Sequence, residues 1–70
     1  MVEVRAEMVA NVWRVVVSPG DRIDAGATLV FLESMKMEIP VESPVAGTVT
    51  DMLVQEGTVV QEGDVIAVVE

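Results

Sequence analysis

The chain alternates short runs of apolar, mostly β-branched residues with short polar segments. From Val2 to Met8, apolar and polar residues alternate, as they do in a strand with one buried face. No segment shows a helical period. Further apolar runs rich in β-branched residues, which favour strands, cover residues 12–17, 28–32, 38–41, 48–54 and 65–69.

Glycine and proline separate these runs at regular intervals. Such residues next to aspartate, serine or glutamate mark tight connections between elements. Several short strands joined in this way are typical of an all-β sandwich or barrel. The turn signals are Pro19-Gly20-Asp21, Ala25-Gly26, Ser43-Pro44, Ala46-Gly47, Glu56-Gly57 and Glu62-Gly63-Asp64.

The sequence also contains an internal repeat. Residues 9–33 align without a gap with residues 46–70, at an offset of 37 positions. Gly20 then falls on Gly57, and the apolar positions on either side coincide. Self-similarity of this kind indicates two copies of one structural unit. We therefore predict that residues 1–70 form a single domain built from two halves related by an approximate two-fold axis.

The repeat predicts where residues 34–37 lie. Glu33 and Glu70 become equivalent positions, so the axis places them at opposite ends of the domain. Strands flank Met35-Lys36 on both sides, which predicts a tight two-residue hairpin. Such turns favour positive φ angles and usually contain Asn-Gly or Asp-Gly. Met-Lys is a poor local choice, and local rules are broken most often at functional or strained sites.

Charge and composition exclude several function classes. Twelve acidic and four basic residues give a net charge of -8, which disfavours nucleic acid and anionic membranes as partners. The chain has no histidine or cysteine, and its four aspartates lack metal-loop spacing. We therefore expect no catalytic residues, no metal and no enzyme activity. Without a signal peptide or a membrane-length apolar run, we expect a cytoplasmic protein.

Lys36 is the only lysine of the chain. The ordinary interpretation of one lysine is a solvated loop residue, here with methionines that cap the core. Its uniqueness, its place between the two halves and its large apolar neighbours favour a site instead. An activated lysine needs desolvation or a nearby cation, whereas Glu33 and Glu38 favour the charged ammonium. Lys36 is therefore expected to be the substrate of a modifying enzyme and not a catalyst.

These residues resemble the biotinyl domains of biotin carboxyl carrier proteins. Pro-Met-Pro-Gly, common in that family before the second strand, is here Glu7-Met8-Val9-Ala10, and Ser34 replaces a common alanine. No insertion that would form a protruding thumb is present. The chain is similar to the small free-standing biotinylated proteins of bacteria, or to a domain of a longer carboxylase. The matching motifs are Gly20-Asp21, Gly26, Glu33-Ser34-Met35-Lys36-Met37-Glu38, Ser43-Pro44-Val45-Ala46-Gly47-Thr48-Val49, Gly57 and Gly63-Asp64.

The resemblance implies a flattened β-barrel of two four-stranded sheets with quasi-two-fold symmetry and the lysine at an exposed hairpin tip. It implies that biotin protein ligase joins biotin to Lys36 as N6-biotinyl-lysine. Met35 and Met37 would be recognised by the ligase or the carboxylase, and Glu33, Ser34 and Glu38 would surround the hairpin.

The resemblance further implies a non-catalytic carrier, monomeric when isolated. Carboxybiotin would travel on it from a biotin carboxylase to a carboxyltransferase, within an acetyl-CoA, other acyl-CoA or keto-acid carboxylase.

Two alternatives stay open at the level of sequence. A lipoyl domain of a 2-oxo acid dehydrogenase has the same fold, but usually carries aspartate before the lysine and alanine after it. Met35 and Met37 argue against that interpretation. An unmodified barrel that serves as a structural module, as in membrane-fusion adaptors, would not need a lysine at the tip.

Overall fold

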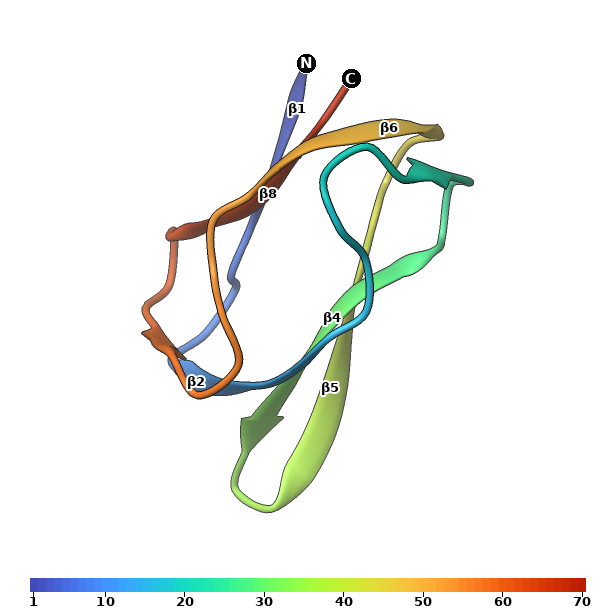
Figure 1. The fold of residues 1–70 in the computed structure, drawn as a ribbon. Helices are drawn as coiled ribbons and strands as arrows, with labels where there is room; N and C mark the ends of the chain where they lie inside the picture. Colours follow the sequence, from blue (N-terminus) through green and yellow to red (C-terminus); the bar gives the residue numbers. More distant parts are fainter.

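The computed structural model describes residues 1–70 and contains strands only, arranged as two four-stranded antiparallel sheets (Figure 1). The sheets have the strand orders β1-β8-β6-β3 and β5-β4-β2-β7. The predicted all-β fold of two four-stranded sheets is confirmed. The strands are β1 (Val2–Arg5), β2 (Ala10–Val15), β3 (Arg22–Ile23), β4 (Thr28–Ser34), β5 (Met37–Glu42), β6 (Gly47–Met52), β7 (Val59–Val60) and β8 (Val65–Val69).

The two halves have matching backbone hydrogen bonds. The Gly20 N–H donates to the Val49 carbonyl at 2.7 Å, and the Gly57 N–H donates to the Val12 carbonyl at 2.8 Å. Each residue of one bond lies 37 positions from its counterpart in the other. The strand orders of the two sheets also interchange when β1, β2, β3 and β4 are exchanged with β5, β6, β7 and β8. The fold therefore has the predicted quasi-two-fold symmetry.

This symmetry extends to β1 and β5, where the sequence showed no repeat. The Gly26 N–H donates to the Ser43 carbonyl at 2.8 Å, and the Gly63 N–H donates to the Ala6 carbonyl at the same distance. Ala6 and Ser43 are thus equivalent, although they share no side-chain chemistry. Ala6 and Ser43 are equivalent through their backbone hydrogen bonds alone, because a backbone carbonyl accepts such a bond whatever side chain its residue has.

Several strand limits differ from those that the apolar runs predict. The first strand ends at Arg5 and not at Met8, because the Ala6 N–H and carbonyl bond to the 63–64 turn and redirect the chain. β2 and β6 both end two residues earlier than expected. The short strands β3 and β7 were not predicted from the runs, since two residues are too few to show a period.

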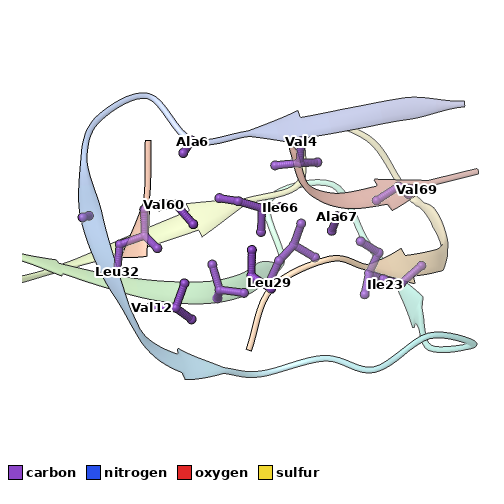
Figure 2. Packing of buried hydrophobic residues seen from close by; sticks show 14 residues of the cluster. Val4, Ala6, Val12, Ile23, Leu29, Leu32, Val60, Ile66, Ala67 and Val69 are labelled. Atoms are coloured by element: carbon purple, nitrogen blue, oxygen red, sulfur yellow. The ribbon is translucent and has the colours of Figure 1, made fainter. Parts of the chain in front are cut away.

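The core between the sheets consists entirely of aliphatic side chains (Figure 2). Leu29 and Ile66 are equivalent residues of the two halves, and both are fully buried. Burying one such side chain stabilises the fold by about 1.5–3 kcal/mol. The full cluster is Val4, Ala6, Ala10, Val12, Ile23, Leu29, Val30, Leu32, Val49, Val54, Val60, Ile66, Ala67 and Val69.

The C-terminus is held close against β6. The Thr48 N–H donates to the Glu70 carbonyl at 2.7 Å, and the Glu70 N–H donates back to the Thr48 carbonyl at 2.9 Å. A Cβ atom on Gly47 would overlap the Glu70 carbonyl oxygen. Glycine is therefore required at position 47 by the close approach of the last strand.

The molecule is elongated, with extents of 31 × 17 × 17 Å. The β4–β5 hairpin projects from one end, and both termini lie at the other (Figure 1). The predicted separation of the 34–37 segment from the C-terminus is confirmed. Since it consists of strands and connections, the structure has no helical segment that could span a membrane.

Candidate attachment site at the hairpin tip

β4 and β5 form a hairpin with a connection of two residues. Their pairing runs from Thr28↔Glu42 to Ser34↔Met37 and leaves Met35 and Lys36 as the turn. Both turn residues have positive φ angles, 53° for Met35 and 64° for Lys36. Positive φ at both central positions is typical of the type I′ turn, whose twist matches that of the flanking strands. The predicted tight hairpin with left-handed backbone is confirmed.

Methionine and lysine are unfavourable in this conformation. A non-glycine residue held in the left-handed region costs on the order of 1–3 kcal/mol. Strained residues of this kind cluster at functional sites, where the surrounding structure imposes the conformation. The hairpin is imposed here by six paired positions along β4 and β5. The conformational preference of the turn therefore does not explain why methionine and lysine occupy the tip.

All three side chains of the Met-Lys-Met segment are exposed. Met35 is 92% exposed and Met37 is 63% exposed, so the interpretation of these methionines as caps of the core is wrong. Lys36 is exposed, and its amine takes part in no side-chain hydrogen bond or ion pair. Its Nζ atom is therefore free to form a covalent bond without breaking a contact within the chain. This geometry fits a covalently attached group.

Glu33 and Glu38 lie directly opposite each other, next to the tip. Both are exposed, and neither pairs with Lys36 or with an arginine, since the one ion pair joins Arg5 and Glu3. Like charges directly opposite each other on adjacent strands slightly destabilise a hairpin. Ser34, half-buried, is paired with Met37 between the carboxylates and the turn. The structure thus brings all six predicted site residues together at one end of the molecule.

Two other features were not anticipated from the sequence. A groove lies between β1 and β5, with Leu32, Ile39 and Met8 in its lining, and Lys36 does not line it. The aromatic residues Trp13 and Phe31 lie outside the core, on the outer face of the β5-β4-β2-β7 sheet. No local sequence pattern indicated this, because a register shift between Val12 and Arg14 interrupts the alternation of the strand. No cluster of three or more histidine, cysteine, aspartate or glutamate side chains suited to a metal ion is found.

Comparisons with known proteins agree with this geometry. Residues 2–69 match the family described as "Biotin-requiring enzyme". The chain is 60% identical over 67 residues to the "Biotinylated protein TB7.3 homolog" of Mycobacterium leprae, which covers 96% of this chain and 94% of that protein. It is 44% identical over 63 residues to the "Biotin/lipoyl attachment protein" of Bacillus subtilis, covering 90% and 86% of the two chains.

Solved structures show the same fold inside much larger enzymes. The urea carboxylase of Kluyveromyces lactis superposes with a TM-score of 0.91 at 31% identity, over 97% of this chain. A single-chain, multi-domain long-chain acyl-CoA carboxylase superposes with a TM-score of 0.86 at 37% identity, over 93% of this chain. The matched parts are 6% and 7% of those enzymes.

The match over nearly the whole chain, the two-sheet fold and the exposed Met-Lys-Met tip lead to one assignment. The chain belongs to the biotin/lipoyl attachment family as a biotin-requiring carrier domain, homologous to the biotinyl domains of carboxylases, with covalently bound biotin as its cofactor.

Proposed function

We propose that Lys36 is the residue that carries biotin, and that the loaded domain moves a carboxyl group between the active sites of a biotin-dependent carboxylase. The observation that carries this proposal is the position of the only lysine, exposed on a strained two-residue tip. The Mycobacterium leprae relative is named as biotinylated, and the two similar solved structures are carboxylases. When bound, biotin supplies a ureido nitrogen that accepts and releases the carboxyl group.

The residues of the chain present the lysine and do not activate it. The type I′ turn directs Met35 and Lys36 away from the barrel, with no neighbour in contact with the amine. No cation or apolar pocket of this chain surrounds the amine, so the deprotonation that precedes attack must come from the modifying enzyme. Biotin protein ligase would supply that base. The amine would displace AMP from biotinyl-adenylate and form an amide, with loss of one proton.

Met35 and Met37 give the ligase an apolar contact surface on either side of the lysine. Methionine is flexible and polarisable, so it adapts to a partner surface with little loss of contact. Both side chains are already exposed. A partner that covered them would gain about 25 cal/mol of binding free energy for each Å² of apolar surface removed from water. The same residues would then contact the biotin carboxylase and the carboxyltransferase, since both enzymes must accept the same tip.

A tethered group finds a second active site at high effective concentration. This is the reason for a small domain that does no chemistry itself. The proposal includes the cytoplasmic location expected from the sequence, where ATP is available to form the adenylate. It also includes the choice of acceptor class, an acyl-CoA or keto acid.

The test is co-expression of the chain with a bacterial biotin protein ligase, followed by intact mass measurement. We expect one added biotinyl group, located on Lys36 by peptide mapping, and none on the Lys36→Arg variant. Avidin and anti-lipoate blots distinguish biotin from lipoate on the same sample. Labelling that persists in Lys36→Arg, or lipoate in place of biotin, would overturn the proposal.

The transfer function needs a separate measurement. Loaded protein is incubated with a biotin carboxylase, ATP and labelled bicarbonate, and the label on the carrier is counted. We expect labelled carrier only when Lys36 is biotinylated. Addition of the matching carboxyltransferase and its acceptor should then release the label.

A further inference from the structure

The only tryptophan and the only phenylalanine of the chain contact each other on its outer surface. The rings of Trp13 and Phe31 meet edge to face, with centroids 6.5 Å apart and an interplanar angle of 88°. Trp13 is 44% exposed, and neither residue belongs to the aliphatic core. Aromatic side chains of this size usually dominate the energetics of cores and of interfaces. Their placement outside the core therefore points to an interface.

The internal symmetry shows that the fold does not need this pair. The positions equivalent to Trp13 and Phe31 in the other half are Thr50 and Val68. Both strands have a bulge at the corresponding point, between Val12 and Arg14 in β2 and between Val49 and Asp51 in β6. The backbone is thus the same in the two halves, while the side chains differ. Packing alone does not require aromatic residues on this face.

A third apolar residue extends the pair across the hairpin, from β4 to β5. Pro40 on β5 lies directly opposite Phe31 on β4 and is exposed. Its equivalent in the other half is Glu3. Trp13, Phe31 and Pro40 together form what we call the aromatic face. The corresponding positions of the other sheet are Thr50, Val68 and Glu3; none is aromatic, and Val68 is buried.

The aromatic face is continuous with the candidate attachment site. Phe31 lies three residues before the end of β4, about 10 Å along the strand, and the Met35-Lys36 turn follows directly. Glu33 and Glu38 lie between them on the same outward-facing side of the hairpin. A partner that reaches the tip from this side therefore passes over two carboxylates before it meets the aromatic residues.

We propose, on the basis of the function proposed above, that biotin protein ligase docks on the aromatic face while it modifies Lys36. The Nζ atom lies five bonds from the lysine Cα, about 6 Å away. The ligase must bring its active site within that distance of the hairpin backbone. A carboxylase acts on the far end of the longer biotinyl-lysine arm, so its contacts can be limited to the Met-Lys-Met tip and need not extend down the hairpin.

The area that a stable ligase contact buries then determines how much of the hairpin surface the ligase must cover. A stable contact buries about 800 Å² on each partner, a patch roughly 30 Å across. The two-residue tip is too small for a patch of this size, so the contact must extend down one face of the hairpin. The outer face offers an aromatic anchor of the kind that dominates binding energy. Glu33 and Glu38 fit a ligase surface in which an apolar depression has a basic rim.

The first test replaces the pair with the residues of the other half, Trp13→Thr together with Phe31→Val. We expect kcat/KM for biotinylation by a purified bacterial biotin protein ligase to fall at least about tenfold, mainly through KM. Lys36 should still become fully labelled at long times. The control is Leu53→Thr, which removes an exposed apolar side chain elsewhere and should leave the kinetics unchanged. Unchanged kinetics in the double variant would overturn the proposal.

A second test does not depend on the variant folding. Trp13 is the only tryptophan, so 5-fluorotryptophan labels a single position of the aromatic face. In the Lys36→Arg background the ligase binds without turnover, and we expect the fluorine resonance to shift or broaden as ligase is added. An unchanged resonance under conditions where unlabelled protein is biotinylated would overturn the proposal.

The outcomes separate this inference from the proposed function. If wild-type protein is not labelled on Lys36, the proposed function fails and the question of docking does not arise. If labelling is normal in the double variant while carboxylation of the loaded carrier is slowed, the aromatic face serves the carboxylase, and the ligase assignment is wrong.

Discussion

Left-handed backbone occurs in two regions of the molecule, and different residues occupy it in each. The turns of the barrel contain glycine at φ angles between 88° and 97°, as at Gly26 and Gly20. The hairpin tip contains methionine and lysine at 53° and 64°. Glycine adopts such angles without strain, whereas other residues do not. The barrel turns thus contain residues that suit the left-handed backbone, whereas the tip contains residues that do not, as expected if the function proposed for Lys36 selects them.

If the function proposed for Lys36 holds, stability depends on the residues of the barrel and modification on the residues of the tip. Changes in the barrel should lower the free energy of unfolding and leave labelling of the folded protein intact. Changes at the tip should alter labelling and leave stability unchanged or improved. The predictions below test this separation from the largest expected effect to the smallest.

Leu29→Ala should have the largest effect on stability. Leu29 is fully buried in the core, and its truncation leaves a cavity. We expect a loss of about 2–5 kcal/mol in the free energy of unfolding, measured by urea denaturation. The matched control is Leu53→Ala at an exposed leucine, with a change within about 0.5 kcal/mol. Equal losses in the two variants would remove the distinction between core and surface on which the comparison rests.

Gly47→Ala should destabilise the barrel by overpacking. The added Cβ would overlap the Glu70 carbonyl oxygen, which belongs to the backbone and cannot rotate away. We expect a loss of about 1–3 kcal/mol, with the amide of Thr48 exchanging faster with solvent because its bond to Glu70 is disturbed. Unaltered exchange at Thr48 would show that the terminal strand moves aside without loss.

Gly57→Ala measures the cost of placing a non-glycine residue at a positive φ angle, without a steric overlap of the added side chain. No atom lies within 4 Å of the added Cβ, so only the φ angle of 91° opposes the substitution. We expect a loss of about 1–2 kcal/mol, the lower part of the range for strained residues. For a domain of this size, each kcal/mol lowers the melting temperature by about 4–8 °C. A melting temperature equal to that of the wild type would contradict the role assigned to glycine in the barrel turns.

Met35→Asn should act in the opposite direction. Asparagine tolerates left-handed backbone, so we expect a gain of up to about 1 kcal/mol in stability together with slower biotinylation. Met37→Asn is the control, because Met37 has no positive φ angle and should slow labelling without a gain in stability. Slower labelling without added stability in Met35→Asn would mean that the turn is not strained.

Sequence patterns predicted the architecture through features that repeat over many residues. The offset of 37 positions between Gly20 and Gly57 implied the symmetry and placed Lys36 at the end remote from Glu70. The equivalence of β1 and β5 was missed because Ala6 and Ser43 correspond only through their backbone bonds. The close approach at Gly47 was missed as well, since it depends on a residue far along the chain.

At the candidate site, the sequence supplied the residues and the structure supplied their arrangement. The run from Glu33 to Glu38 stood out because Lys36 is unique and the turn residues suit a turn poorly. The cross-strand pairing of Glu33 with Glu38 required the register of the hairpin. Trp13 lies at the bulge of β2 where it contacts Phe31, and no local sequence pattern predicts the position of that bulge.

The two termini leave the barrel side by side, because β1 pairs with β8 and Val2 lies opposite Val69. The hairpin tip is at the far end of the long axis (Figure 1). In a longer protein joined to this domain at either terminus, the connection would therefore be at the end of the long axis opposite the hairpin tip. Any small rotation at that base is amplified at Lys36 by the 31 Å length of the domain, before the side chain itself moves. In such a protein, the length of the domain would set how far a group attached at the hairpin tip moves for a given rotation at the base.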